Sequence, residues 1–360
     1  MNLECLLIAD DLTGACDAAA PFAARGLATQ VALSTEVQSV DSCDVLALNT
    51  SSRDVPAMQI DCAMRAAAAY GSRFTPRVLF KKIDSTLRGN IALELESAMR
   101  HFGYCAAVVC PAFPALGRVV REGFLCVEYD NGFEPIQLST QLSCAHFPAG
   151  KIRRAIARGQ RLISVDAACD QDLDAIAAEL LSLETPVLWA GSAGLASALA
   201  RSMRAHTVES AVPNVRGPVL FCIGSTHPVT NAQAAALIER TASTCIDASL
   251  SGENIAAFLR DRHVVLRMPR GKVAEESIRA YLKGAAPSAI VLSGGDTALF
   301  VCRALNVDSI QIRTELLPGI PLGVMCGGAF DGAHVITKSG GFGAPDALLR
   351  IADYFSCPKH

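Results

Sequence analysis

The sequence contains no long hydrophobic run. Among its 360 residues, no apolar stretch approaches the ~20 residues that a helix needs to cross a bilayer. The start, from Met1 to Glu4, also lacks the basic region that opens a secretory signal. We therefore expect a protein without a membrane-spanning helix, and the cytoplasm is its expected location.

An excess of charge of either sign is also missing. Lysine and arginine total 32 against 35 aspartate and glutamate residues, so the formal net charge is −3 and the isoelectric point is about 6.2. Binding to nucleic acid or to an anionic membrane depends on a strongly basic surface. We expect neither partner, and any anionic ligand must be held by local groups.

The 14 cysteines include no C-x-x-C pair, the spacing that is typical of zinc and redox sites. Most lie in apolar stretches, as Cys105, Cys110, Cys222 and Cys302 do. Buried, reduced thiols are therefore the favoured state. Cys357, near the C-terminal end, is the one thiol that we expect to be exposed.

Two common nucleotide-binding motifs are absent as well. No stretch matches the P-loop pattern G-x-x-x-x-G-K-[ST], and none is a complete G-x-G-x-x-G after a strand with an acidic residue suitably placed downstream. A Walker-type ATPase and a Rossmann dehydrogenase are therefore both disfavoured.

The composition and the hydrophobic pattern are those of a packed α/β protein. Hydrophobic residues make up 51% of the chain and charged residues 19%, and the length suits about two domains. Short apolar runs alternate with helical stretches, as in parallel α/β sheets. The best boundary is the polar stretch 205–218, which contains Pro213 and Pro218. We expect an α/β fold with two domains, each a mostly parallel sheet flanked by helices.

An acidic corner follows the first predicted strand. The apolar run Cys5–Ala9 stops at Asp10 and Asp11, and Thr13 opens an alanine-rich helical stretch. Ligands of parallel sheets bind at the carboxyl ends of strands. One Asp or Thr is enough to cap the helix, so the second carboxylate indicates a site. For this stretch alone, the alternative is a capping Asp11 or Thr13 beside a solvated Asp10.

A second polar strand end follows the strand predicted over 77–83. Its polar residues are Lys81, Lys82, Asp84, Ser85, Thr86 and Arg88. Both charge signs, two hydroxyl groups and a helix N-terminus at one place suit a ligand with a carboxylate or a phosphate. A capped helix with its cations on the surface is the alternative for this stretch.

A stiff loop follows the strand predicted over 106–110. It reads PAFPALGR and ends at Arg118. Two prolines and a glycine before a single charged residue are more typical of the wall of a ligand site than of a linker. We therefore expect Arg118 to lie near the ligand.

Three strand ends in the second half of the chain combine glycine with Ser, Thr or Asp. They are Gly224-Ser225, Gly294-Gly295-Asp296-Thr297 and Gly340-Gly341-Phe342-Gly343. Glycine lets backbone N–H groups approach a phosphate closely, and the following helix adds partial positive charge. Three such corners in one domain favour a nucleotide site. Together with the charged strand ends of the first half, they favour phosphoryl transfer, in which catalysis is mainly positioning and charge neutralisation.

These motifs resemble those of the four-carbon acid sugar kinases. The resemblance rests on IADDLTGACDAAAPFAARG, KKIDSTLRGN, PAFPALGR, VDA with a following DLDAIA, GSTHPVTNAQ, SGGDTA, PGIPLG and KSGGFG, which span nearly the whole chain in the family's order. Members phosphorylate tetronates such as threonate, erythronate or their 3-oxo relatives with ATP. The resemblance thus implies an ATP-dependent kinase of carbohydrate catabolism that acts on the terminal hydroxyl of a four-carbon sugar acid, with Mg²⁺ bridging the phosphates.

The resemblance also implies the roles of the domains and of the motif residues. Residues 1–208 would bind the sugar acid and residues 217–356 the nucleotide, with the active site in the cleft between the two domains. The implied catalytic residues are Asp10, Asp11, Asp84 and Arg88. The implied substrate-binding residues are Thr13, Lys82, Ser85, Thr86 and Arg118. The implied nucleotide-binding residues are Ser225, Gly294, Gly295, Asp296, Thr297, Gly340 and Gly341.

The chemistry of these residues agrees with that assignment. We expect Arg88, with Lys82, to hold the substrate carboxylate. One of Asp10, Asp11 and Asp84 would orient or deprotonate the attacking hydroxyl. The sequence does not decide which of the three aspartates does so, and it does not identify the metal ligands. A homodimer is one possible oligomeric state.

The chain departs from the family after a hairpin predicted over 123–136, with its turn at Asp130-Asn131-Gly132. Family members carry a longer segment there, near the sugar site, and only residues 137–150 stand in its place. We therefore expect an altered acceptor pocket. The alternatives are a kinase of a different small hydroxy acid and a non-catalytic ligand-binding or regulatory homologue.

Overall fold

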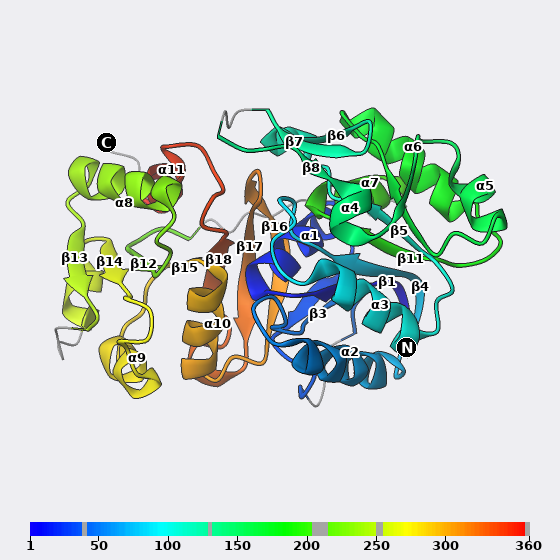
Figure 1. Ribbon diagram of the computed structural model, residues 1–360. Coiled ribbons are helices and arrows are strands. Elements are labelled where there is room, and N and C mark those ends of the chain that lie inside the picture. The colour runs from blue at the N-terminus through cyan, green and yellow to red at the C-terminus, as the bar shows by residue number, and fades with distance from the viewer. Residues whose placement is uncertain (38–41, 129–131, 204–214, 250–254, 357–360) are drawn as a thin grey trace. The chain divides into compact units, whose positions relative to one another are not determined.

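The computed structural model describes residues 1–37, 42–128, 132–203, 215–249 and 255–356. The predicted turn at Asp130-Asn131, most of the predicted linker and Cys357 lie outside these residues. The chain divides into two compact units, Met1–Val208 and Glu209–His360 (Figure 1). The assignment of sugar-acid binding and nucleotide binding to two domains stays a prediction.

The first unit contains a parallel sheet with the strand order β2-β3-β1-β4-β11-β5-β10-β9. Its strands are β1 (Asn2–Ala9), β2 (Thr29–Ala32), β3 (Val45–Asn49), β4 (Thr75–Lys82), β5 (Ala107–Cys110), β9 (Ala145–Phe147), β10 (Leu162–Val165) and β11 (Leu188–Gly191). The central strands are buried over most of their length, which explains their continuous apolar sequences.

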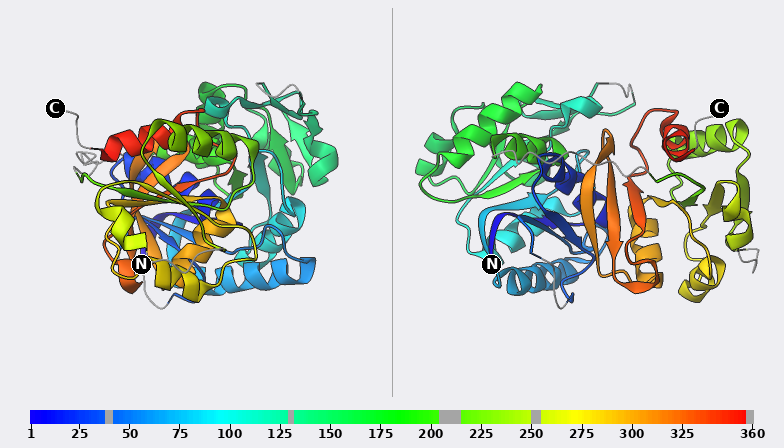
Figure 2. Two further views of the ribbon diagram at one scale, coloured as in Figure 1. Left: turned by 90° about the vertical axis from the view of Figure 1, so that its left-hand side faces the viewer. Right: turned by 180° about the vertical axis from the view of Figure 1, so that it is seen from behind.

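Helices cover both faces of this sheet (Figure 2). They are α1 (Leu12–Ala24), α2 (Ala57–Gly71), α3 (Ile91–Phe102), α4 (Leu138–Leu142), α5 (Ile152–Ala157), α6 (Asp170–Leu181) and α7 (Ala193–Ser202). Parallel crossovers are right-handed, so the direction of each move along the sheet decides the face. The move from β1 to β2 places α1 on one face, where it contacts α7. The opposite moves, from β3 to β4 and from β4 to β5, place α2 and α3 together on the other.

The strands β1 and β4 are neighbours whose following helices lie on opposite faces of the sheet. Open α/β sheets bind ligands beyond the carboxyl ends of such a strand pair. In the register of the sheet, Ala9 at the end of β1 lies between Asn49 of β3 and Lys82 of β4. The polar residues that follow these three strands therefore leave the sheet at the same level.

A small antiparallel sheet lies apart from the main sheet of the first unit. Its strands are β6 (Arg118–Arg121), β7 (Phe124–Val127) and β8 (Ile136–Gln137), preceded by the 3₁₀ turn η1 (Pro114–Leu116). The antiparallel β7–β8 pair matches the predicted hairpin. Sequence reasoning missed the first hairpin, in which Glu122 and Gly123 join β6 to β7 with positive φ angles.

The second unit contains a mixed sheet with the strand order β13-β14-β12-β15-β18-β17-β16. Its strands are β12 (Val219–Ile223), β13 (Thr244–Asp247), β14 (Val264–Arg267), β15 (Ala289–Ser293), β16 (Ser309–Leu317), β17 (Ile320–Cys326) and β18 (His334–Lys338). Parallel pairing joins β13, β14, β12, β15 and β18 in that order, whereas β17 pairs antiparallel with both β18 and β16. The prediction of a mostly parallel sheet is confirmed, but β13 and β16 were missed.

Helices of the second unit pack in two pairs, α8 with α11 and α9 with α10. They are α8 (Pro228–Arg240), α9 (Glu275–Leu282), α10 (Gly295–Ala304) and α11 (Ala347–Phe355), with 3₁₀ turns η2 (Ile255–Arg260) and η3 (Gly328–Phe330). From β12 the chain moves toward β13, and from β14 it moves the opposite way to β15. The neighbours β12 and β15 therefore form the strand pair at which this unit is expected to bind a ligand.

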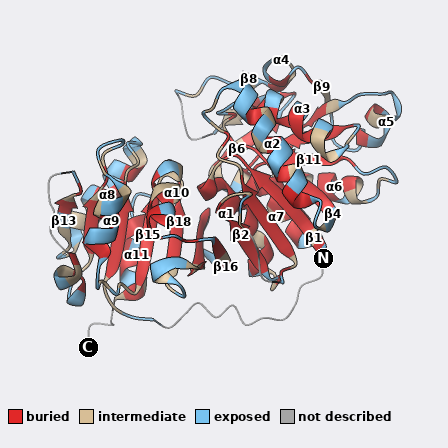
Figure 3. Ribbon diagram, turned by 90° about the horizontal axis from the view of Figure 1, so that it is seen from below, coloured by how far each residue is buried: buried red, intermediate tan, exposed pale blue. Residues whose placement is uncertain are grey.

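The strands of both sheets are mostly buried, whereas the helices that cover them expose their outer faces (Figure 3). Every cysteine in the described part of the chain is free. The expectation of buried thiols holds for Cys110, Cys222 and Cys302 and is wrong for Cys105, which lies exposed in the turn before β5. Within the described residues, no helix has the length and apolar character that spanning a bilayer requires.

Candidate active site

Asp11 and Thr13 form the acidic corner at the start of α1. Asp11 Oδ1 accepts a hydrogen bond from Gly14 N at 2.8 Å, so Asp11 is the N-cap of this helix. Thr13 Oγ1 donates to Asp11 Oδ2 at 3.0 Å. The capping role of Asp11 is confirmed. The alternative of a solvated Asp10 is wrong, because that residue is buried.

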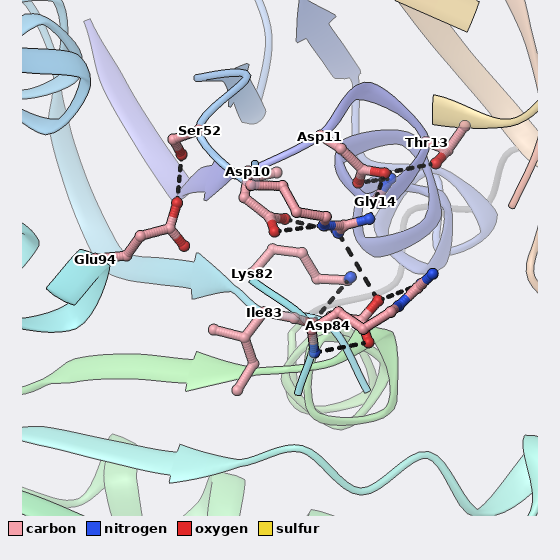
Figure 4. Close-up of polar contacts among 12 residues, drawn as sticks. Asp10, Asp11, Thr13, Gly14, Ser52, Lys82, Ile83, Asp84 and Glu94 are labelled. Atoms are coloured by element: carbon pink, nitrogen blue, oxygen red, sulfur yellow. Dashed lines mark hydrogen bonds and ion pairs between the residues drawn. The ribbon is translucent and has the colours of Figure 1, made fainter. Parts of the chain in front are cut away.

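Arg53 binds Asp10, and sequence reasoning assigned no role to this arginine. Its Nε and Nη2 donate to the two carboxylate oxygens of Asp10 at 2.7 and 2.9 Å. Its Nη1 donates to Asp11 Oδ2 at 2.8 Å, and Nη2 lies 3.9 Å from Asp84 Oδ2. One guanidinium group thus joins three carboxylates from the ends of β1 and β4 (Figure 4).

Asp84 organises the turn after β4. Its Oδ1 accepts hydrogen bonds from Thr86 N at 2.9 Å and Thr86 Oγ1 at 2.6 Å, and its Oδ2 accepts one from Arg88 Nη2 at 2.6 Å. Ser85 is buried in the same turn. The structure therefore brings these four predicted site residues together. It also shows that the Arg88 guanidinium is bound to Asp84.

The two lysines at the end of β4 point to opposite sides of the strand, as neighbouring strand residues do. Lys81 Nζ forms a buried ion pair with Glu94 Oε2 at 2.9 Å, beneath the site. Lys82 Nζ lies beside Gly14 and donates to the carbonyl oxygen of Ile83 at 3.1 Å. No carboxylate of the described residues lies within 4.0 Å of it, so Lys82 supplies the corner with a cation that has no acidic partner (Figure 4).

Arg118 begins β6 and is half-buried. Burial lowers the pKa of this guanidinium, while the nearby carboxylates of Asp84 and Asp17 act in the opposite sense. Asp84 therefore lies within electrostatic reach of Arg118, and contact of Arg118 with a ligand stays a prediction.

The pKa values of the buried carboxylates are set by the surrounding cations. Burial acts to raise the pKa of Asp10, but the charges of Arg53, Lys81 and Lys82 outweigh it and hold that pKa below its usual value. Burial also acts to raise the pKa of Asp84, and hydrogen bonding with the charge of Arg88, together with Arg53, holds it far below the usual range. Both groups are ionised at neutral pH, so they accept hydrogen bonds well and are weak bases.

The three glycine corners of the second unit converge. Ile223, Ser293 and Lys338 lie side by side at the ends of β12, β15 and β18. A methyl group added at Gly224 would collide with Thr297 Oγ1. The glycine corners that follow these three strands thus leave the sheet at the same level and are in direct contact.

Ser225 is at the centre of this group. A methyl group at Gly340 would collide with Ser225 Oγ, and one at Gly294 would lie 3.4 Å from Ser225 Cβ. Gly341 lies against the ring of His227, whose Nδ1 accepts a hydrogen bond from Val229 N as the cap of α8. Ser225, Gly294, Gly340 and Gly341 therefore lie together, and their binding of a nucleotide stays a prediction.

A pocket of about 310 Å³ lies next to this site. Its lining includes Gly224 and Thr297 from the glycine corners and the apolar side chains of Met268, Val273 and Phe300. Gly295 and Asp296 open α10 at its edge, and the exposed Asp296 forms a 3.0 Å ion pair with Arg270. A mostly apolar hollow beside free glycine N–H groups suits a nucleotide, with its base in the hollow and its phosphates at the glycines.

A tightly bound metal does not fit the described residues. Among them, no group of three or more His, Cys, Asp or Glu side chains is arranged to hold a metal ion. The buried Asp10 and Asp84 are already neutralised by arginines. Mg²⁺ bound mainly by nucleotide phosphates, with at most one or two protein carboxylates, does fit this pattern.

Comparison with known proteins identifies the family of this chain. Residues 5–149 and 136–199 match the profile of a sugar-binding N-terminal domain, and residues 267–348 match that of a nucleotide-binding C-terminal domain. The chain is 33% identical over 396 residues to the D-threonate kinase of Bordetella bronchiseptica, with 96% of each chain covered. The chain belongs to the four-carbon acid sugar kinase family. It is therefore a phosphotransferase that acts on an alcohol group.

Other relatives of this kinase act on different tetronates. It is 26% identical to the D-erythronate kinase of Heliobacterium modesticaldum, with 97% of this chain and 96% of the relative covered. It is 25% identical to the 3-oxo-tetronate kinase of Cupriavidus necator, with 94% of each covered.

Solved structures share the fold of this kinase. One is described as a putative tRNA synthase from Salmonella typhimurium, with 21% identity, a TM-score of 0.78, and 96% of this chain and 98% of that chain covered. Another, from Bordetella bronchiseptica, is described as a domain-swapped dimer with bound citrate. It has 31% identity, a TM-score of 0.51, and 99% of this chain and 98% of that chain covered.

The predicted departure from the family finds support in two of these matches. The sugar-binding profile matches in two pieces that overlap at residues 136–149. The alignment with the D-threonate kinase spans 396 residues, more than the 360 of this chain, so the relative contains segments that this chain lacks. In the structure, the short segment forms α4 and β9.

Proposed function

We propose that this kinase transfers phosphate from ATP to the terminal hydroxyl of a four-carbon sugar acid. The observation that carries the proposal is the ammonium group of Lys82, which has no described carboxylate within 4.0 Å, at the same strand ends as the carboxylates of Asp10, Asp11 and Asp84. A cation suits the carboxylate of a sugar acid, and fixed carboxylates suit its hydroxyl groups. Of the tetronates, D-threonate is the first expected substrate, because the D-threonate kinase is the relative with 33% identity.

The side chains of the first unit would bind and orient the acceptor. Lys82 is the better candidate for the substrate carboxylate than Arg88, because Asp84 already binds the Arg88 guanidinium at 2.6 Å. Asp10 and Asp84 stay ionised and would accept hydrogen bonds from substrate hydroxyls. Phosphoryl transfer demands little base strength, so orientation of the attacking hydroxyl is the larger part of their contribution.

The side chains of the second unit would bind the nucleotide. Ser225, Thr297 and the N–H groups of Gly340 and Gly341 would contact the phosphates, and the hollow beside Phe300 would take the base. Mg²⁺, which neutralises phosphate charge when it is bound, would arrive with ATP. Asp296, at the edge of this site, would contact the ion by exchanging its exposed ion pair with Arg270.

The proposal is tested by measuring ADP release over D- and L-threonate, D- and L-erythronate, their 3-oxo forms and several larger aldonates. We expect turnover on one tetronate and loss of turnover in Asp84→Asn. The matched control is Asp174→Asn, which changes an exposed carboxylate paired with Arg201 and should keep full turnover. If no tetronate is turned over and ATP does not bind, the chain is a non-catalytic homologue.

A different small hydroxy acid is the second candidate substrate. The reason is the overlap of the two profile matches at residues 136–149, where the family's longer segment is missing. This candidate would be supported if the protein binds ATP, turns over no tetronate and turns over a larger aldonate.

Lys82→Met is predicted to raise the KM for the sugar acid by about 10- to 100-fold, since a hydrogen bond to a charged group contributes about 1.5–3 kcal/mol. The KM for ATP should stay unchanged. The matched control is Lys151→Met, which removes an exposed lysine of the same unit. Equal KM values for the sugar acid in Lys82→Met and the wild type would remove Lys82 from the acceptor site.

We also propose a homodimer, following the relative that is described as a domain-swapped dimer. Light scattering after size-exclusion chromatography tests this, and a monomeric mass at micromolar concentration would contradict it.

A further inference from the structure

The loop that follows β18 is held from beneath by buried side chains. Lys338 Nζ donates to the carbonyl oxygen of Ser339 at 3.0 Å and lies 3.5 Å from that of Gly340. Thr230 Oγ1, on α8, donates to the carbonyl oxygen of Gly340 at 2.6 Å and accepts from Lys338 Nζ at 3.1 Å. Further along the loop, Gln233 Nε2 binds three more carbonyl groups at 2.8 to 3.1 Å. The carbonyl groups of this loop therefore point into the protein.

This arrangement fixes the direction of two N–H groups. The Ser339 carbonyl shares a peptide plane with Gly340 N–H, and the Gly340 carbonyl shares one with Gly341 N–H. In a trans peptide the two groups point in opposite directions, so both N–H groups face away from Lys338. Neither donates a hydrogen bond to a residue in the described part of the chain. Successive free N–H groups of this kind bind phosphate oxygens.

Lys338 also places a positive charge beneath the glycines. Its side chain is fully buried, and burial lowers its pKa to about 8. The groups that contact its ammonium group are neutral, namely the hydroxyl of Thr230 on α8 and the loop carbonyls of Ser339 and Gly340. The Thr230 hydroxyl lies in turn 3.5 Å from that of Ser293 on β15. The ionisable side chains of the corner are His227, at the start of α8, and Asp296, which is exposed and paired with Arg270. No described carboxylate shifts the pKa of Lys338.

We propose that Lys338 is a positioning residue for the phosphates of the nucleotide. It turns the carbonyl groups of the loop inward, so that the N–H groups of Gly340 and Gly341 are presented to the phosphates, and its positive charge strengthens their attraction. Lys338 acts through the loop and does not touch the nucleotide. The inference rests on the proposed use of ATP. It adds Lys338 to the nucleotide-binding site, as the residue that orients the N–H groups of the motif glycines.

The charge on Lys338 links ATP affinity to pH. A bound polyanion favours the protonated lysine and raises its pKa. ATP affinity is therefore fully present below the pKa of the free protein, about 8, and falls as the pH rises through it. For a rise of about one pKa unit on binding, the Kd increases about sevenfold between pH ~7 and ~9.5 and approaches a tenfold increase at higher pH. The ionisation of phosphate groups, near pH 6, lies below this window.

The test measures ATP binding by calorimetry from pH 7 to 9.5, without acceptor. We expect the Kd of the wild type to rise about sevenfold over this range, with proton uptake on binding above pH 8. Lys338→Met should bind ATP about tenfold more weakly at pH 7 and show no rise with pH. Thr230→Val, which removes the hydroxyl beside the ammonium group, should weaken binding and keep the pH dependence.

The control is Lys283→Met, which removes an exposed lysine at the end of α9 and should leave both the Kd and its pH dependence unchanged. If Lys338→Met does not fold, the pH dependence and proton uptake of the wild type still test the proposal. A wild-type Kd that is constant from pH 7 to 9.5 overturns the role of Lys338. Absence of ATP binding at every pH instead overturns the proposed function.

Discussion

Replacing Arg53 by glutamine is expected to lower kcat/KM for the sugar acid by about 100-fold or more, because the carboxylates of the site lose the cation that fixes their geometry. Removing one partner of a buried ion pair typically costs about 3–5 kcal/mol. Arg53 makes three hydrogen bonds to Asp10 and Asp11 and lies 3.9 Å from Asp84. Without its guanidinium group, carboxylates from two strand ends repel one another. Their geometry around the acceptor would be lost together with their charge balance.

The same change should destabilise the protein in a pH-dependent way. In the wild type, the pKa of Asp10 lies below its usual value, so its favourable contribution is present above about pH 4 and is lost as the pH falls further. In Arg53→Gln, the largest of the charges that oppose the effect of burial is lost, so the pKa of Asp10 rises relative to the wild type. The loss of unfolding free energy should therefore be larger at pH 7 than at pH 4. Chemical denaturation at both pH values measures this difference.

Two variants control for this prediction. Arg77→Gln makes the same substitution in an exposed pair with Glu4, and both turnover and stability should stay near those of the wild type. Arg53→Lys keeps the charge and loses the bidentate geometry, so its activity should lie between those of the wild type and Arg53→Gln. A folded Arg53→Gln variant with full turnover would show that the three carboxylates need no shared cation.

The importance of Arg53 could not have been derived from the sequence alone. The motif around Asp10 and the motif around Asp84 each contain several polar residues, and their pattern identified both as parts of a site. Arg53 stands by itself after β3, and its role depends on the position of β3 beside β1 in the sheet. Sheet order is a tertiary property that local spacing does not determine. The best available signal was that three predicted strands ended in polar residues.

Lys81 and Lys82 illustrate a second limit of prediction from the sequence. Both looked like surface or ligand-binding cations in the sequence, and strand alternation implied only that they point to opposite sides. The structure places Lys81 in a buried ion pair with Glu94 of α3 and places Lys82 at the site. Which side faces the site depends on the face that α3 covers. That face follows from the handedness of the crossover and from the sheet order together.

In the second unit, sequence reasoning identified the glycine corners but not the scaffold beneath them. Glycines next to strand ends are visible as a pattern. The buried hydroxyl of Thr230 and the amide of Gln233 lie on α8 and bind carbonyl groups more than a hundred positions further along the chain. Strands β13 and β16 were missed for a related reason, since each is partly exposed and carries polar residues among its apolar ones.

Gly340→Ala is expected to abolish measurable ATP binding at millimolar concentrations while leaving sugar-acid binding intact. The added methyl group would collide with Ser225 Oγ and lie 3.2 Å from His227 Cβ. These neighbours cannot both retreat, because Ser225 packs against Gly294 and His227 caps α8. The loop would have to shift, and its N–H groups would move away from the phosphates. Calorimetry with ATP and, separately, with the sugar acid measures both affinities.

The matched control is Gly332→Ala, in the loop between β17 and β18 of the same unit. There the added methyl group meets open space, although the φ angle of +82° makes alanine strained. Gly332→Ala should therefore cost about 1–2 kcal/mol of stability and leave ATP binding unchanged. This pair separates a collision at the glycine corner from a general cost of replacing glycine. Normal ATP affinity in Gly340→Ala would mean that the phosphates bind elsewhere in the second unit, and weakened affinity in both variants would mean that strain alone disturbs the site.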